Sequence, residues 1–364
     1  MTEPLHKPPR KDPQARTVSP TTPPAARSRS AHVFTANAAE GRLTLQQCET
    51  CGAWSYPARD ACGECLSTDL VWKDVLPTGR LIAETTIRTS TNTYFRERTP
   101  WRIGSVQLEC GPTVMAHVHG DAEASGPVRL IARTDRAGQG TLFALPEEDT
   151  CNMADDRQLR QLTCDPRHRR VLVTDGRSEL GQAMARTLSE AGADQVFVGI
   201  AEDWRPFDGE AGLRGLDSVT CMPLDLTDTT SVQELAAEIG GKADILVNTA
   251  EHVRPGGVLD RRDVTSARDE MEIACFGLLR LMQSFGPAMS ARGADGENSA
   301  AAWVNIFSVF ALCNMPGFGL TNASQAAGLS LAQSLRAELR GSGVKVVNGF
   351  IGPLEEDWRQ PLPP

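Results

Sequence analysis

The chain has 364 residues, and 40% of them are hydrophobic, which is enough for two ordinary domains with separate cores. Its formal net charge of -9 excludes a broadly basic surface that would attract nucleic acid or an anionic membrane. No apolar run reaches the roughly 18 residues of a membrane span, and the N-terminus lacks the apolar core of a signal peptide, so we expect a cytoplasmic protein.

Residues 1–32 are rich in proline, basic residues, serine and threonine. A segment of this composition buries too little apolar surface to offset the entropy of ordering, so we expect a disordered tail. A docking or anchoring role for this tail stays open.

Four of the ten cysteines form two Cys-x-x-Cys pairs, namely Cys48, Cys51, Cys62 and Cys65. Two such turns deliver four thiolates to a tetrahedral metal, with metal–sulfur distances of about 2.3 Å. A reducing compartment disfavours disulfides, and the pairing disfavours a redox role. We therefore expect a structural zinc ribbon over residues 33–74, with iron as the open alternative. Four cysteines leave no free coordination position, so the metal would serve folding.

Short segments with alternating apolar and polar residues fill residues 75–147, and glycine and proline separate them. Period-2 alternation at this spacing predicts a small antiparallel barrel, and five such segments fit an OB-fold. OB-folds often bind nucleic acid through aromatic platforms and basic grooves. The aromatic residues here are few (Tyr94, Phe95, Trp101 and Phe143), so we expect no nucleic-acid partner.

The ribbon "CETCGAWSYPARDACGEC", the preceding "AAEGRLTLQQC" and the later "PWRIGSVQL" resemble the acyl-CoA-associated zinc-ribbon/OB-fold proteins. The resemblance covers residues 34–146. Members of that family are small subunits that bind thiolase-like enzymes, including thiolases and aldolases, and help to close their acyl-CoA sites. The resemblance therefore implies a thiolase-like partner for this half of the chain.

After residues 148–167, which read as an interdomain linker that allows a short helix, apolar strands alternate with amphipathic helices over residues 168–364. This alternation is typical of a parallel, doubly wound α/β sheet of the Rossmann type. Its first strand–helix turn reads "TDGRSELG", at the place where such sheets carry glycines for a diphosphate.

That turn resembles the Thr-Gly-x-x-x-Gly-x-Gly motif of short-chain dehydrogenases, with Asp175 and Glu179 at the first two glycines and only Gly181 kept. Asp225 corresponds to the acid that touches the adenine, and Asn248 to the asparagine after the fourth strand. At about 5 Å and an effective dielectric of about 20, each carboxylate would repel a phosphate charge by about 3 kcal/mol. The acids would instead satisfy the dipole of the helix N-terminus, so we expect no bound NAD(P).

The segment "VNIFSVFALCNMPGFGLTNASQAAG" resembles the active-site segment of the same family. The resemblance places the catalytic serine at Ser308, but Thr321 replaces the tyrosine, Gln325 the lysine and Ala274 the helix asparagine. Reduction of a ketone needs a proton donor, and a threonine hydroxyl is far too weak an acid for that role. In the family a substrate lid and a final strand follow the turn at Gly352, so we expect a degenerate, C-terminally truncated domain.

These losses predict a non-catalytic subunit of an acyl-CoA-processing complex. In short-chain dehydrogenases the helices after the fourth and fifth strands pair between subunits, and residues 268–290 and 321–340 correspond to them. We expect this seam to hold an active dehydrogenase, such as one for 3-hydroxyacyl-CoA, or a second copy of the chain.

Two alternatives remain open. The first is a divergent NAD(P)-dependent oxidoreductase acting on an acyl-CoA or ketone, in which Ser308 works with a proton donor such as Cys313 or His252. The second is a binding module for acyl-CoA or nucleic acid.

Overall fold

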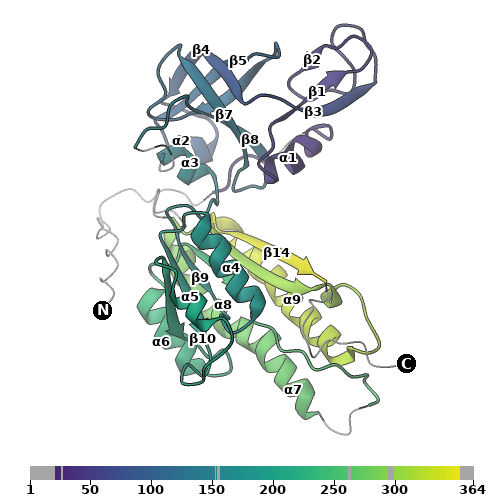
Figure 1. Cartoon of the computed structure of the whole chain (residues 1–364), viewed down its shortest axis with the longest axis vertical. Helices are drawn as coiled ribbons and strands as arrows, with labels where there is room; N and C mark the ends of the chain where they lie inside the picture. Colours follow the sequence, from purple (N-terminus) through teal and green to yellow (C-terminus); the bar gives the residue numbers. More distant parts are fainter. Residues whose placement is uncertain are drawn as a thin grey trace. The chain divides into compact units, whose positions relative to one another are not determined.

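The computed structural model describes residues 21–25, 28–151, 153, 156–260, 264–293 and 299–352. The chain divides into two compact units, with the boundary between Asp165 and Pro166 (Figure 1). Most of the expected N-terminal tail lies outside the described residues, and helix α1 (Ala31–Ala39) begins at the end of it. Among the described residues, no helix is long and apolar enough to cross a membrane.

The first unit begins with a small antiparallel sheet in the order β2-β1-β3. Its strands are β1 (Thr44–Cys48), β2 (Trp54–Ser55) and β3 (Leu70–Asp74). The first Cys-x-x-Cys turn follows the end of β1, and the second lies in the loop between β2 and β3. Helix α1 packs on the neighbouring barrel, where the hydroxyl of Thr35 accepts a hydrogen bond from the backbone N–H of Gly140 at 3.0 Å.

A closed barrel with the strand order β4-β5-β6-β8-β7 completes the first unit and confirms the predicted OB-fold. Buried residues alternate with more exposed ones along most of its second, third and fourth strands, as period-2 patterning requires, and Leu81, Val106 and Leu130 lie in its core. The strands are β4 (Thr78–Ile87), β5 (Trp101–Leu108), β6 (Thr113–Val118), β7 (Pro127–Thr134) and β8 (Gly140–Pro146). Two short helices accompany them, α2 (Thr93–Arg96) and α3 (Arg157–Leu162), and α3 lies within the segment expected to be a linker.

The described part of the second unit contains a six-stranded parallel sheet in the order β11-β10-β9-β12-β13-β14, which confirms the doubly wound fold. Strand order reverses between β9 and β12, and ligands of such sheets bind beyond the carboxyl ends of the strands at this point. The strands are β9 (Arg170–Val173), β10 (Gln195–Ile200), β11 (Val219–Pro223), β12 (Ile245–Asn248), β13 (Ala302–Ser308) and β14 (Lys345–Ile351).

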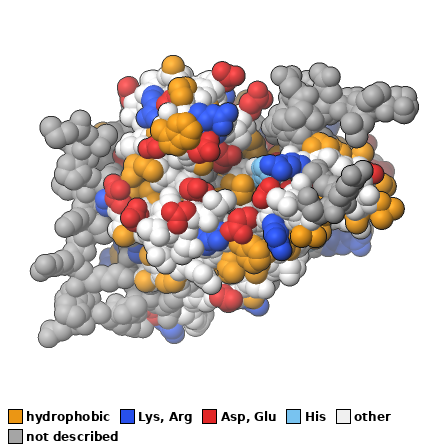
Figure 2. All heavy atoms as spheres, turned by 90° about the horizontal axis from the view of Figure 1, so that it is seen from below, with side chains coloured by type: hydrophobic (Ala, Val, Ile, Leu, Met, Phe, Trp, Pro, Cys, Tyr) orange, Lys and Arg blue, Asp and Glu red, His pale blue; other side chains and the backbone are white. Residues whose placement is uncertain are grey.

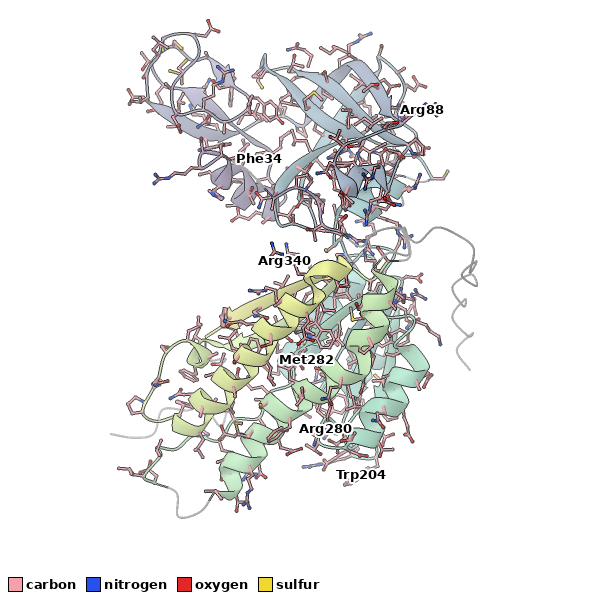
Figure 3. All side chains as sticks on the ribbon, turned by 180° about the vertical axis from the view of Figure 1, so that it is seen from behind. Phe34, Arg88, Trp204, Arg280, Met282 and Arg340 are labelled. Carbon is pink, nitrogen blue, oxygen red and sulfur yellow. The ribbon has the colours of Figure 1, made fainter. Side chains whose placement is uncertain are left out.

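Helices cover both faces of this sheet. Figure 1 shows α4 and α5 in front, and Figure 3, from behind, shows the helices whose apolar side chains share one core cluster with Trp303 of β13. The helices are α4 (Glu179–Glu190), α5 (Glu210–Arg214), α6 (Thr229–Ile239), α7 (Thr265–Met271), α8 (Leu278–Arg292) and α9 (Gly319–Leu339). A π-helical turn, η1 (Glu272–Gly277), joins α7 to α8, and short 3-10 turns lie at Val309–Ala311 and Arg340–Ser342.

Candidate functional sites

The four cysteines predicted to bind metal lie together. Their Sγ atoms are all within 4.8 Å of one another, and the pairs Cys48–Cys65 and Cys51–Cys62 are each 3.6 Å apart. Four thiolates at about 2.3 Å from a tetrahedral zinc ion are separated by about 3.8 Å, so the cluster fits structural zinc. Cys48 and Cys62 are buried and Cys51 and Cys65 are exposed, so one side of the cluster faces solvent.

The two cysteine turns have the same local geometry. The N–H of Gly52 donates to the carbonyl of Cys48 at 2.8 Å, and the N–H of Leu66 donates to that of Cys62 at 3.1 Å. Both residues that close the turns, Gly52 and Leu66, have a positive φ, of 76° and 61°. Within the first turn, backbone N–H groups of Cys51 and Thr50 lower the pKa of the Cys48 thiol to about 6, whereas the adjacent thiols of Cys65 and Cys62 help to raise the pKa of Cys51 to about 12. A low thiol pKa favours the thiolate that a metal requires.

Close packing and local hydrogen bonds hold the first strand–helix turn of the second unit in place. A Cβ added at Gly181 would lie 1.5 Å from the carbonyl oxygen of Asp175, which explains why this glycine remains. Gly176 also serves packing, since a Cβ there would lie 2.3 Å from Cγ1 of Val198. The carboxylate of Asp175 accepts a hydrogen bond from the N–H of Arg177 at 3.0 Å, and burial raises its pKa. Glu179 is exposed at the start of α4.

Arg177, which the sequence analysis did not single out, ties this turn to the loop after β10. Its guanidinium donates to the carbonyls of Ala201, Glu202 and Arg205 at 3.2, 3.2 and 2.8 Å. It also lies 5.1 Å from the centre of the Phe207 ring. In dinucleotide-binding sheets, the end of the second strand is where the adenosine ribose is bound. Here a side chain of the protein crosses that region.

The other positions expected near a cofactor serve the fold. The hydroxyl of Thr174 donates to the side-chain oxygen of Asn248 at 2.8 Å, which links β9 to β12. The carboxylate of Asp225 accepts two hydrogen bonds from Thr227, at 2.8 and 2.7 Å, and so holds the turn before α6. Glu251, three residues after Asn248, is a further acid in this part of the chain, and the sequence analysis did not single it out.

At the tyrosine position, the hydroxyl of Thr321 donates to Oε2 of Glu270 at 2.8 Å, and both residues are 0% exposed. Glu270 lies at the end of α7, one helical turn before Ala274. Sequence reasoning missed Glu270. A lone acid on the inner face of an amphipathic helix was the available signal, but only the structure shows that it meets Thr321.

The remaining catalytic positions are also bonded within the fold. The side-chain oxygen of Gln325 accepts a hydrogen bond from the backbone N–H of Ser308 at 3.1 Å. The hydroxyl of Ser308 in turn accepts one from the N–H of Phe310 at 3.3 Å and caps a 3-10 turn. Ala274 lies in the π-helical turn, where a Cβ added at Gly328 would come within 2.6 Å of its carbonyl oxygen. Helix α9 is therefore packed closely against the former asparagine position.

The two alternative proton donors lie in loops that border these positions. Cys313 is exposed in the loop after β13, and its thiol contacts the carbonyl of Val309 at 3.4 Å. His252 is half-buried after β12, and burial together with the charge of Arg254 lowers the pKa of its imidazole. A neutral imidazole at physiological pH is a poor proton donor.

The seam predicted from the helices after the fourth and fifth strands contains a groove of about 570 Å³ between α8 and α9. Met282, labelled in Figure 3, lies in this groove. Its apolar lining includes Leu279, Met282, Pro287, Leu331, Leu335 and Leu339. On the face shown in Figure 2, Lys and Arg side chains are interspersed with acidic and apolar ones.

Comparison with known families agrees with this architecture. Residues 169–363 match the model of the short chain dehydrogenases, which is more than half of the chain, so the chain belongs to that family. Residues 36–71 match "ChsH2, rubredoxin-like zinc ribbon domain", and residues 72–133 match "ChsH2, C-terminal OB-fold domain". The protein therefore carries a zinc ribbon and an OB-fold ahead of a short-chain dehydrogenase domain, as the sequence predicted.

Individual relatives match the second unit. A short-chain dehydrogenase of Penicillium crustosum is 32% identical over 194 residues, covering 51% of this chain and 66% of the fungal protein. An uncharacterized oxidoreductase of Mycobacterium bovis is 30% identical over 199 residues, covering 51% of this chain and 55% of its own length. The chain thus spans about two thirds of these relatives or less. A short chain dehydrogenase from Burkholderia cenocepacia, solved with NADP, is 28% identical with a TM-score of 0.48, covering 55% of this chain and 78% of its own.

Proposed function

We propose that this protein is a non-catalytic subunit of an acyl-CoA-processing assembly. The observation that carries the proposal is the pair of hydrogen bonds at the former catalytic positions, from Thr321 to Glu270 and from Ser308 to Gln325. The buried carboxylate of Glu270 accepts the one hydrogen that the Thr321 hydroxyl can donate, and Gln325 bears no charge that would lower the pKa of a neighbouring hydroxyl. This arrangement lacks the tuned proton donor that hydride transfer to a ketone requires.

The nucleotide turn supports the same proposal. Asp175 and Glu179 bring negative charge to the helix N-terminus that would face a diphosphate, and Arg177 bonds to the loop beside the adenosine region. Binding of NAD(P) would have to overcome the repulsion and break the three contacts of Arg177. We therefore expect the folded chain to bind neither NAD nor NADP.

The two units suggest two partners. The zinc ribbon and OB-fold match domains whose family, by the resemblance above, binds thiolase-like enzymes, so we assign a thiolase or aldolase to the first unit. The groove between α8 and α9 is lined mainly by apolar side chains, with Gln283, Ser290, Ser334 and Glu338 among them, and we assign to it an active short-chain dehydrogenase or a second copy of this chain. In such an assembly a 3-hydroxyacyl-CoA oxidised on one enzyme would be cleaved on the next.

Native mass spectrometry of the full chain, co-expressed with a thiolase-like enzyme and a short-chain dehydrogenase from the same organism, tests the proposal. We expect a stoichiometric complex in which this chain carries zinc and no nucleotide. A solitary chain with bound NADP, or one that turns over an acyl-CoA without a partner, would establish the oxidoreductase alternative instead.

A matched pair of substitutions on α9 separates the two interfaces. Leu331→Arg places a charge in the apolar groove and should release the dehydrogenase or the second copy while leaving the thiolase-like enzyme bound. Gln333→Arg places the same charge on an exposed position of the same helix and should change neither. If both variants assemble like the wild type, the groove is not the interface.

A further inference from the structure

The sheet of the second unit ends at β14, and in the described part of the chain no strand pairs with the outer side of β14 (Figure 1). The N–H of Lys345 donates to the carbonyl of Ala301 at 3.0 Å, and the register of β14 with β13 is unbroken from there on. The odd-numbered residues of β14 therefore bond toward β13. Because alternate residues of a parallel strand bond to opposite sides, Val346, Asn348 and Phe350 point their N–H and C=O groups away from the sheet.

Most of these outward groups have no hydrogen bond. Within the described residues only the carbonyl of Val346 has one, from Nε of Arg336 on α9 at 3.2 Å. A carbonyl oxygen has two lone pairs, so this one is able to accept a second bond. Two side chains of the strand are exposed as well, Val347 by 36% and Phe350 by 38%. The outer edge of β14 is therefore apolar and carries unused backbone donors and acceptors.

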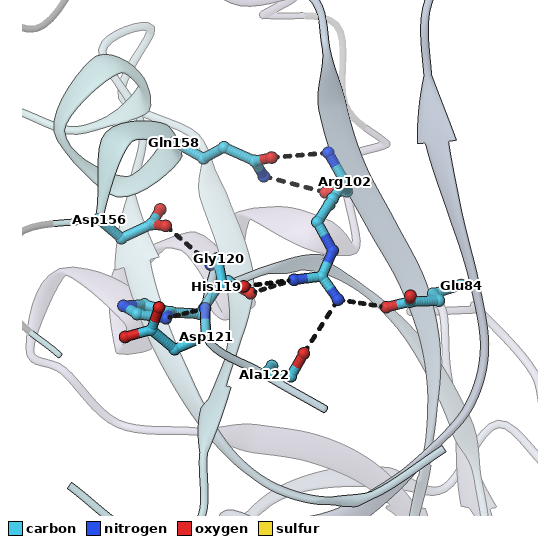
Figure 4. Close-up of polar contacts among 8 residues, drawn as sticks. All are labelled: Glu84, Arg102, His119, Gly120, Asp121, Ala122, Asp156 and Gln158. Carbon is cyan, nitrogen blue, oxygen red and sulfur yellow. Dashed lines mark hydrogen bonds and ion pairs between the residues drawn. The ribbon is translucent and has the colours of Figure 1, made fainter. Parts of the chain in front are cut away.

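Other strand edges of this chain carry the residues that keep edges from pairing, namely charged residues and proline. At the opposite edge of the same sheet, β11 ends in Pro223, which has no N–H. In the ribbon, β3 carries the exposed Lys73. The outer half of β4 pairs with β5 but not with β7, and it carries Glu84, which Arg102 of β5 contacts at 2.6 Å (Figure 4). By contrast, β14 has no proline, and its one charged residue is Lys345 at the first position.

We propose that the outer edge of β14 pairs with the same edge of a second copy of this chain, antiparallel and across a two-fold axis at Asn348. The outward residues lie symmetrically about Asn348. The axis therefore places Val346 opposite Phe350 of the second copy, and Asn348 opposite Asn348 of the second copy. Each facing pair exchanges two backbone hydrogen bonds, as in any antiparallel ladder. The sheets of the two copies then form one continuous sheet.

The side chains along this seam are complementary, which favours a second copy as the occupant. The axis brings the exposed Phe350 beside Val346 of the second copy, and such aromatic–aliphatic pairs stabilise neighbouring strands. It also brings the exposed Val347 opposite Gly349, which has no side chain to oppose it. Lys345 lies at the end of the seam, so like charges do not face each other. A second copy supplies all of these matches at once, because the axis repeats each of them.

Sedimentation velocity of the full chain, without other proteins, tests the proposal. A seam of one strand pair is small, so we expect a monomer–dimer equilibrium with a dissociation constant on the order of 10 µM. Val347→Lys adds the kind of side chain that guards natural edges and should raise this constant roughly tenfold or more. Thr85→Lys, the matched control, places the same charge on the exposed edge of β4 and should leave the constant unchanged. An equal rise in the control, no rise with Val347→Lys, or a chain that stays monomeric throughout would overturn the proposal.

Hydrogen exchange supplies the second measurement. In the wild type the amide of Asn348 should be protected only at concentrations at which the dimer forms. Protection that is independent of concentration would mean that another segment of the same chain, such as residues 353–364, covers the edge, and the proposal would be wrong. Asn348→Pro removes an outward N–H but leaves the amides that bond to β13. It should abolish the dimer while the amides of Val347 and Gly349 stay protected; a dimer that persists in this variant would also contradict the proposal.

This seam does not rest on the proposed function, since no residue of β14 lines the groove between α8 and α9. Leu331→Arg, in that groove, should therefore leave the β14 dimer intact. A dimer that dissociates with Leu331→Arg and not with Val347→Lys would belong to the groove, and the inference about β14 would be wrong while the proposed function stands.

Discussion

The metal cluster and the positions that correspond to the catalytic and glycine positions of short-chain dehydrogenases differ in how far apart their residues lie along the chain. The four cysteines come from two short turns, and their sulfurs lie within 4.8 Å of one another. The residues of the cleft come from distant segments, and there the family's catalytic and glycine positions hold side chains that bond to the protein itself. Polar side chains at buried positions of a fold therefore need partners within the chain, and here those partners come from distant segments.

The largest effect should come from breaking the metal cluster. Cys48→Ser removes one buried ligand, and metal binding to structural zinc sites contributes on the order of 10 kcal/mol to folding. We expect zinc to be lost and the amide protection of β1 and β3 to disappear, as measured by metal analysis and hydrogen exchange. Cys313→Ser, at an exposed cysteine outside the cluster, should retain both; a loss of zinc there would contradict the assignment.

The free energy of unfolding of the second unit should depend more on the buried charge of Asp244 than on Thr321 or Asp175. Asp244 pairs with Arg170 at 3.4 Å and with Arg292, and all three side chains are largely buried. Asp244→Ala removes the carboxylate that both cations pair with and should cost about 3–5 kcal/mol in the free energy of unfolding.

The exposed pair of Glu210 and Arg214, 2.8 Å apart on α5, provides the control for that measurement. Glu210→Ala should cost less than about 1 kcal/mol. Comparable losses in denaturant unfolding of the two variants would show that burial of the Asp244 network is not what stabilises the domain.

A smaller effect is expected at Thr321, which corresponds to the tyrosine position of the family. Thr321→Val keeps the shape of the side chain but removes the hydrogen bond to the buried carboxylate of Glu270, at a cost of about 1–3 kcal/mol. Ser334→Ala removes an exposed hydroxyl from the same helix and should leave the free energy of unfolding nearly unchanged. If Thr321→Val is equally neutral, the bond to Glu270 does not contribute to the fold.

The smallest predicted change is a pH-dependent gain in stability on replacing Asp175. Burial raises the pKa of Asp175 in the folded chain above its unfolded value, so ionisation of this group favours the unfolded state, and stability falls as the pH rises above the unfolded pKa. Asp175→Asn keeps an acceptor for the N–H of Arg177 and should stabilise the protein slightly at neutral pH. The gain should vanish below the unfolded pKa of about 3.9. Urea unfolding at the two pH values measures it, and an equal gain at both would exclude burial as the cause.

Much of the fold could be predicted from the sequence because its signals are local. Cysteine spacing indicated the ribbon, period-2 alternation indicated the barrel, and alternating strands and helices indicated the parallel sheet, all of which the structure or the family models confirm. The sequence also showed where this chain differs from the family motifs, because those motifs have set spacings along the chain. The differing positions are Asp175, Thr321 and Gln325.

Only the tertiary structure showed which partners Thr321 and helix α3 contact. Thr321 and Glu270 are 51 positions apart, and Tyr94 and Gln161 are 67 apart, so no local pattern predicts that they meet. A residue's type and spacing determine which bonds it is able to make. Which partner it finds depends on the packing of distant segments, and in this chain that packing brings Glu270 to Thr321 and Gln161 of α3 to Tyr94.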